Sequence, residues 1–145
     1  MRDIMNWKEC EEKFIRKAEV DKKRIESLLE KTRLRLKRAR NTELNSETVS
    51  LIVEDYYEVI KELLVAFLLK NGLRSNNHQC LISYFYKENP DYEKQAFLIL
   101  QMSFFRNRLN YYGESIPLEF YGKNKKEFEN IIEIIKTLIK IQLQS

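Results

Sequence analysis

The chain has few residues that turn or break a backbone. Only three of its 145 residues are glycine and two are proline, whereas 33% are charged and 43% are hydrophobic. Sheet proteins need many tight turns, which these two residues commonly make, so their scarcity argues against an all-β fold and favours long amphipathic helices. The lack of glycine also argues against the strand–loop–helix units that bind nucleotide phosphates.

Long apolar segments are missing as well. The longest apolar run, Leu63 to Leu69, is far shorter than the roughly 18 residues that a membrane-spanning helix needs. The first residues, Met1 to Ile4, contain no apolar core of the kind found in a signal peptide. We therefore expect a cytosolic protein that makes no contact with a membrane.

Residues that bind metals or act as nucleophiles are also scarce. The two cysteines, Cys10 and Cys80, are far apart and match neither a zinc-binding spacing nor a redox pair, so each is expected to be a buried free thiol. His78 is the only histidine, and no nucleophile motif is present. The sequence thus predicts neither a metal nor a cofactor, and it disfavours a conventional metabolic enzyme.

What the sequence does contain is hydrophobic periodicity of the helical kind. It predicts an all-α fold, an up-and-down bundle of about five helices in one domain spanning residues 1–145. A long basic N-terminal helix is expected in residues 1–44, and the core of the bundle in residues 45–142. Stop and cap signals at Asn71-Gly72, Asn89-Pro90 and Gly113 set the helix boundaries. The expected helices run from about residue 6 to 40, 45 to 71, 75 to 88, 91 to 112 and 123 to 144.

Positive charge is concentrated near the N-terminus. Residues 1–40 contain 14 Lys and Arg against 8 Asp and Glu, which is compatible with an anionic partner. Six basic residues flank the apolar stripe of the expected first helix, with Lys31, Arg35 and Arg38 on one side and Arg33, Lys37 and Arg40 on the other. Their stems can cover the stripe while their charges stay in water, and this explains the cluster fully. The alternative is a surface that binds nucleic-acid phosphates.

The most informative segment ends the expected fourth helix, and it reads Arg106-Asn107-Arg108-Leu109-Asn110-Tyr111. In a continuous helix Asn107 and Tyr111 share one face, while Arg106 and Asn110 share the adjacent one. An arginine fork pairs with phosphate oxygens, and an aromatic ring stacks on bases, so the segment suits RNA. Alternatively it is a polar helix end, where Arg106 pairs with Glu114 or another carboxylate.

The order of these segments resembles the HEPN superfamily, in particular its small stand-alone archaeal members. The resemblance covers residues 45–142: a long helix ends at Lys70-Asn71-Gly72, a short one opens at His78, and the Arg106 segment ends the next. It implies a homodimer of helical bundles that acts as a metal-independent ribonuclease or is an inactive relative of one. Such proteins are often toxins or RNA-processing modules.

The family motif transfers only in part. Arg106 matches its arginine and Asn107 the polar residue that follows, but Tyr111 stands where the family has its histidine. Tyrosine, with an ordinary pKa near 10, is a poor base, whereas histidine titrates near neutrality. His78 resembles a histidine that recurs before the short helix; it either packs at that helix end or replaces the missing base.

The resemblance therefore predicts catalytic roles for Arg106, Asn107 and Tyr111, with His78 as a further candidate. The expected RNA contacts are Arg106, Arg108, Asn110, Lys31, Arg35 and Arg38. The leading hypothesis is an RNA-interacting protein with a weakened endoribonuclease site at a homodimer cleft. The alternative is a protein-interaction module that pairs with a nucleotidyltransferase or an antitoxin, and the broad apolar face of residues 45–71 supports it.

Overall fold

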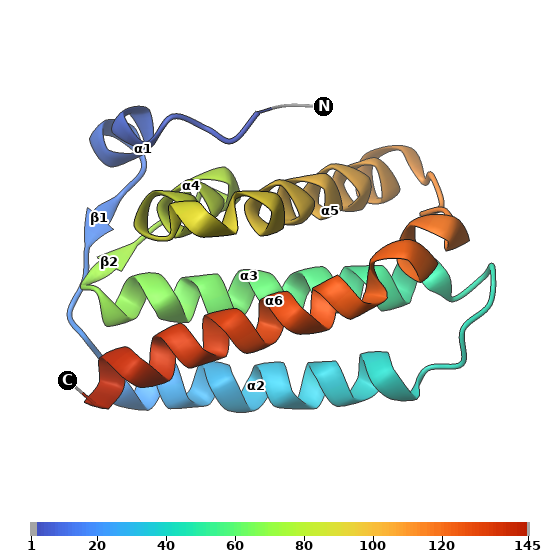
Figure 1. Cartoon of the computed structure of the whole chain (residues 1–145), viewed down its shortest axis with the longest axis horizontal. Coiled ribbons are helices and arrows are strands. Elements are labelled where there is room, and N and C mark those ends of the chain that lie inside the picture. The colour runs from blue at the N-terminus through green and yellow to red at the C-terminus, as the bar shows by residue number, and fades with distance from the viewer. Residues whose placement is uncertain (1–2, 145) are drawn as a thin grey trace.

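The chain folds as a bundle of α-helices, confirming the predicted all-α class. The structure is a computed structural model that describes residues 3–144, with side chains through residue 140. Its long helices are α2 (Lys22–Asn41), α3 (Val49–Lys70), α5 (Glu93–Tyr112) and α6 (Leu118–Gln144), and they run along a common direction (Figure 1). Shorter α1 (Trp7–Lys13) and α4 (His78–Glu88) lie at one end of the bundle. Within the described residues no helix is long and apolar enough to cross a membrane.

Helix α3 is the centre of the hydrophobic core. It contacts α2, α4, α5 and α6, so nearly its whole circumference is buried. Tyr56, Tyr57 and Phe67 are among its fully buried side chains. Each large apolar side chain contributes about 1.5–3 kcal/mol when removed from water. The broad apolar face of this segment is thus buried against other helices of the same chain.

Local capping residues set most of the helix ends. Asn77 caps α4, because its side chain accepts hydrogen bonds from the backbone amides of Gln79 and Cys80. Gly113 ends α5 in the left-handed conformation, with φ at 65°, which glycine adopts at little cost. A short 3-10 turn, η1 (Pro90–Tyr92), joins the two helices. The predicted ends of α4 and α5 are confirmed, and their predicted starts are three and two residues too early.

The single long helix predicted from residue 6 to 40 is wrong in its first half. Helix α1 ends at Lys13, and β1 (Arg16–Lys17) then pairs antiparallel with β2 (Leu73–Arg74) beyond the end of α3. Helix α2 begins only at Lys22, where the Asp21 side chain accepts a hydrogen bond from the backbone amide of Arg24. The strand pairing is a non-local contact that helical periodicity does not reveal.

The prediction of two free thiols is also wrong. Cys10 of α1 and Cys80 of α4 form a disulfide, although 70 residues separate them in the sequence. Both cysteines are fully buried. The extended segment after α1 lets that helix fold back against α4 (Figure 1), and this return brings the two sulfur atoms together.

Candidate functional site

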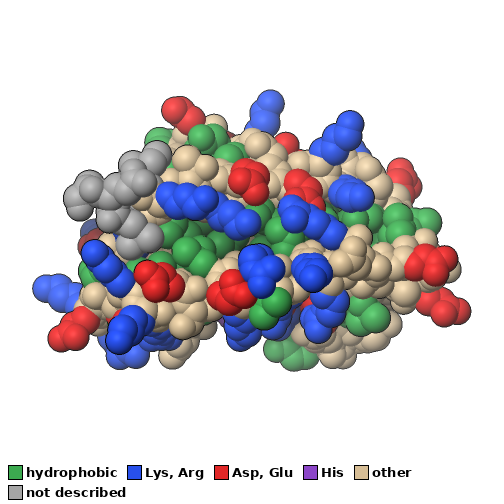
Figure 2. Space-filling view, turned by 90° about the horizontal axis from the view of Figure 1, so that it is seen from below, with side chains coloured by type: hydrophobic (Ala, Val, Ile, Leu, Met, Phe, Trp, Pro, Cys, Tyr) green, Lys and Arg blue, Asp and Glu red, His purple; other side chains and the backbone are tan. Residues whose placement is uncertain are grey.

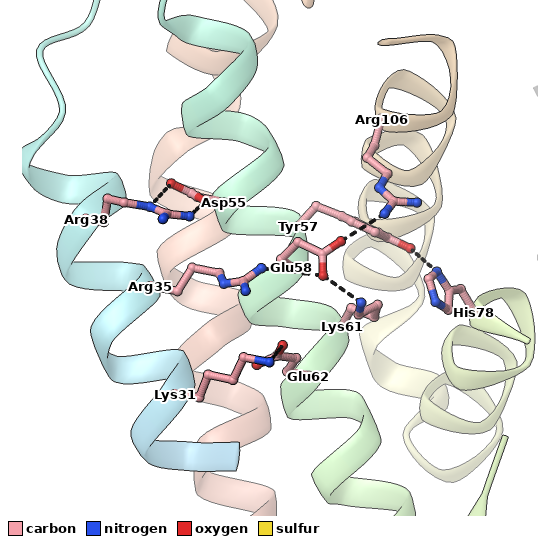
Figure 3. A network of polar contacts seen from close by, with 10 residues as sticks. All are labelled: Lys31, Arg35, Arg38, Asp55, Tyr57, Glu58, Lys61, Glu62, His78 and Arg106. Carbon is pink, nitrogen blue, oxygen red and sulfur yellow. Dashed lines mark hydrogen bonds and ion pairs between the residues drawn. The ribbon is translucent and has the colours of Figure 1, made fainter. Parts of the chain in front are cut away.

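The Arg106 segment is divided between two sides of α5. The Arg106 side chain lies toward α3, where its Nη2 is 3.2 Å from Oε1 of Glu58 (Figure 3). Asn107 and Tyr111 instead line a pocket on another face of the same helix. Successive residues of a helix point about 100° apart, so Asn107 and Tyr111 share a face that Arg106 does not. The motif therefore contributes to two neighbouring sites.

The first site is a cation cluster, which we define as Arg35, Lys61 and Arg106 around the carboxylate of Glu58. Lys61 Nζ is 2.6 Å and Arg35 Nη1 is 3.6 Å from Glu58 Oε2. Burial raises the pKa of Glu58, but the hydrogen bond from Lys61 and the charges of Lys61, Arg106 and Arg35 outweigh it, so the pKa is lowered. One carboxylate thus faces three cations, and the cluster keeps an excess of positive charge.

His78 lies beside this cluster at the start of α4. Its Nδ1 is 3.4 Å from the hydroxyl oxygen of Tyr57, and the guanidinium of Arg106 lies 5.8 Å from the centroid of the Tyr57 ring (Figure 3). Burial lowers the pKa of His78, and the charges of Lys61 and Arg106 lower it further. The imidazole is therefore neutral at neutral pH, which is the form that a general base requires.

The second site is a pocket of about 550 Å³, here called the aromatic pocket. It is lined by Gln79, Leu100, Phe104, Asn107, Arg108, Tyr111 and Tyr112. The Arg108 guanidinium lies 4.9 Å from the ring centroid of Tyr112 and 5.8 Å from that of Phe104. Arg108, rather than Arg106, pairs with Glu114. Of the two partners that the sequence suggested for Arg106, Glu114 pairs with its neighbour, and Arg106 itself pairs with another carboxylate, Glu58.

A chain of polar side chains joins the two sites. Gln79, at the pocket, donates a hydrogen bond of 3.4 Å from Nε2 to the hydroxyl oxygen of Ser103, a buried residue of α5. Ser103 in turn lies close enough to the Tyr57 hydroxyl to favour its ionised form, and Tyr57 contacts His78. Burial raises the pKa of Tyr57, so its hydroxyl remains protonated at neutral pH. The cation cluster and the aromatic pocket are therefore neighbours across α5.

The predicted RNA contacts on α2 are occupied by carboxylates of α3. Lys31 pairs with Glu62, Arg38 pairs with Asp55, and Arg35 shares Glu58 with the cation cluster (Figure 3). Figure 2, seen from the α2 side, shows Lys and Arg side chains interspersed with Asp and Glu. These contacts favour the interpretation of the basic residues as part of helix packing. Among the three, only Arg35 reaches the candidate site.

Tyr111 and Asn110 are exposed, and neither contacts His78. The Tyr111 side chain is 79% exposed and lines the aromatic pocket, away from Tyr57 and the cation cluster. His78, by contrast, is half-buried among the charged groups that surround Arg106. The structure therefore brings together Arg106 and His78 from the predicted set, and it places Asn107 and Tyr111 elsewhere.

Several residues of the site were not predicted from the sequence. Tyr57, Glu58 and Lys61 lie on α3, whose pattern was assigned entirely to packing. The available signal was the pair Glu58 and Lys61, a carboxylate and an ammonium three residues apart in a strongly apolar helix. Gln79 carries no charge and belongs to no motif, so nothing in the sequence distinguishes it as a site residue.

Comparison of the chain with protein-family models, with curated proteins and with solved structures gives no match. The resemblance to HEPN proteins therefore depends on the Arg106 motif and on the order of the helices. Among the described residues, no group of three or more His, Cys, Asp or Glu side chains is placed to hold a metal ion.

Proposed function

We propose that the chain is a HEPN-like RNA-interacting protein whose metal-independent endoribonuclease site is weakened. One observation carries the proposal: Arg106 and His78 meet at Tyr57, with Lys61 beside them. Cleavage of RNA without a metal needs a base for the 2′-hydroxyl group and cations for the charge that develops on the phosphate. A histidine that is neutral at neutral pH and a group of partly exposed cations meet these two needs.

In this proposal Arg106 and Lys61 bind the scissile phosphate. The planar fork of Arg106 pairs with two phosphate oxygens, and Lys61 adds a point charge. His78 takes the proton-transfer role that the resemblance gives to the position of Tyr111. That role requires the tautomer in which Nδ1–H donates to the Tyr57 hydroxyl oxygen and Nε2 keeps its lone pair.

Two features weaken the site. Glu58 already neutralises part of the charge of Arg106, Lys61 and Arg35, so a phosphate must compete with a carboxylate held in place by the fold. The Nε of Arg106 is buried without a hydrogen-bond partner among the described residues, so only the outer nitrogens of the fork are accessible to a ligand. We therefore expect the site to bind RNA but to cleave it only slowly.

The homodimer, the RNA ligand and the cytosolic location belong to the same proposal. Two-fold packing of α5 against its copy would bring two cation clusters to one cleft. The disulfide between Cys10 and Cys80 counts against the cytosolic part of the proposal, because disulfides are more common in oxidising compartments. The exposed rings of Phe104, Tyr111 and Tyr112 support the second candidate, a module that binds a protein partner such as an antitoxin or a nucleotidyltransferase.

Binding of labelled single-stranded RNA by the full chain, titrated at several salt concentrations, tests the proposal. Arg106→Ala is expected to lower affinity about tenfold and to reduce the salt slope by about 0.7, the value for one lost phosphate contact. Arg40→Ala is the matched control, because it removes an arginine that pairs with Glu129 outside the cluster. Equal affinity of both folded variants and the wild type would refute RNA binding at Arg106.

Cleavage assays in the presence of a chelator assign the base. Any cleavage by the wild type is expected to disappear in His78→Ala and to persist in Tyr111→Phe, because only His78 lies at the cation cluster. Activity that survives the first change and is lost in the second would return the proton-transfer role to Tyr111.

A further inference from the structure

The aromatic pocket is not needed for the phosphate chemistry proposed above, yet it has an unusual surface. Tyr111 and Tyr112 are 79% and 70% exposed, and Phe104 is 41% exposed. Large rings usually gain stability by burial, so three exposed rings in the second half of α5 are not explained by core packing. Gly113 ends the helix directly after Tyr112, and residues 110–115 at this end of α5 are exposed.

The polar groups of the pocket have a distinct chemistry. Gln79 and Asn107 contribute side-chain amides, each of which carries both a hydrogen-bond donor and an acceptor. Arg108 adds a planar cation that already lies over Phe104 and Tyr112. At about 550 Å³ the pocket falls within the usual size range of small-ligand sites. Rings, a guanidinium plane and two amides together match a flat, heteroaromatic ligand.

We propose that the aromatic pocket binds a nucleobase of single-stranded RNA. The base stacks on the exposed rings of Tyr111 and Tyr112 and beside the plane of Arg108, while the amides of Asn107 and Gln79 hydrogen-bond its edge. Unpaired RNA bases are recognised in this way, by aromatic and guanidinium stacking combined with contacts to the base edge. The proposal rests on the proposed RNA-binding function and specifies that the pocket binds a base rather than a phosphate.

The position of the pocket relative to the cation cluster supports this assignment. The two sites occupy adjacent faces of α5, and Ser103, which accepts a hydrogen bond from Gln79 at the pocket, lies beside Tyr57 at the cluster. An RNA strand that crosses α5 can thus place a phosphate at Arg106 and a base at Tyr111. The phosphate contact supplies affinity that is independent of sequence, and the pocket supplies contacts to a base.

The test compares two oligoribonucleotides of equal length, one with bases and one abasic, for binding to the full chain. The wild type is expected to bind the oligomer with bases about tenfold more tightly, the contribution of one stacked base. In the double variant Tyr111→Ala and Tyr112→Ala, this preference is expected to vanish while affinity for the abasic oligomer is unchanged. The corresponding double Phe variant is expected to keep the preference, because phenylalanine still stacks.

Leu51→Ala is the control, since it removes an exposed hydrophobic side chain of α3 outside the pocket, and it is expected to behave as the wild type. Equal, salt-dependent binding of both oligomers by the wild type would overturn the pocket assignment and leave the proposed function intact. Absence of binding to either oligomer would overturn both. A wild-type dimer that the double Ala variant dissociates, without any base preference, would show that the rings contact a second copy instead.

Discussion

Glu58 and Glu129 are both partly buried carboxylates that form an ion pair with an arginine, but their surroundings differ. Glu129 of α6 forms an ion pair with Arg40, whose Nε and Nη2 lie 3.1 and 2.5 Å from its two oxygens, and the charge of Lys125 adds a weaker effect. The hydroxyl of Tyr56 donates a further hydrogen bond to it, 2.6 Å long. Glu58 faces three cations from α2, α3 and α5, at distances from 2.6 to 3.6 Å.

The difference separates a structural ion pair from a site with capacity for a ligand. The charges of Glu129 and Arg40 balance, and their contacts tie α2 and α3 to α6. At Glu58 the cations outnumber the carboxylate, so a second anion can bind there without leaving a buried charge unpaired. Tyr56 and Tyr57 are neighbours in the sequence, yet their hydroxyl groups lie on different sides of α3. Tyr56 donates to Glu129, whereas the Tyr57 hydroxyl oxygen is 3.4 Å from Nδ1 of His78.

The largest expected effect concerns the disulfide. It joins α1 to α4, the helix that carries His78 beside the Glu58 cluster, and it does not involve α6, which carries Glu129. Replacing Cys10 and Cys80 by Ala is expected to lower the free energy of unfolding by about 4 kcal/mol, because the closed loop spans 70 residues. Urea denaturation measures the loss. Amide exchange is expected to rise at the start of α4, beside His78, more than in α6. An unchanged unfolding free energy would show that the cross-link has no stabilising role.

Replacing each of the neighbouring tyrosines, Tyr56 and Tyr57, by phenylalanine tests the difference between the Glu129 and Glu58 sites. Tyr56→Phe is expected to cost about 2 kcal/mol, because it removes a buried hydrogen bond to the charged Glu129. Tyr57→Phe is expected to cost less than about 1 kcal/mol, since its contact to His78 is neutral and 3.4 Å long. Thermal or urea unfolding of both variants gives the comparison. A larger loss of unfolding free energy for Tyr57→Phe than for Tyr56→Phe would show that the Glu58 side contributes more to stability, contrary to this account.

The smallest effect is a pH dependence at the Glu58 side. The unfolded chain protonates its only histidine below about pH 6.5, whereas the folded state does so only at lower pH, because burial, Lys61 and Arg106 lower the pKa of His78. The free energy of unfolding therefore falls as pH falls below about 6.5, by less than about 1.4 kcal/mol per pH unit.

His78→Gln is expected to abolish this dependence between about pH 6.5 and 5.5, above the range in which the carboxylates titrate. Urea unfolding of both proteins at several pH values measures it. A variant that retains the full slope of the wild type would show that His78 does not titrate as its surroundings require.

Local signals account for most of what could be predicted from the sequence. The Asn77 cap, the Gly113 stop and the helical spacing between them are contained in a few consecutive residues, and they placed α4 and α5 correctly. The pairing of β1 with β2 and the disulfide join segments more than 50 residues apart, so no local pattern reveals them. For the same reason, the sequence indicates Arg106 and His78 as separate candidates but not their proximity, which depends on contacts of both with Tyr57 of a third helix.

The affinity for single-stranded RNA of two folded variants, Glu58→Gln and Glu129→Gln, tests the central claim most directly. Both changes remove one negative charge, but only the first frees cations that are proposed to bind phosphate. We expect Glu58→Gln to bind RNA severalfold more tightly than the wild type at low salt, and Glu129→Gln to bind it with unchanged affinity. Unchanged or weaker binding by Glu58→Gln would contradict the account.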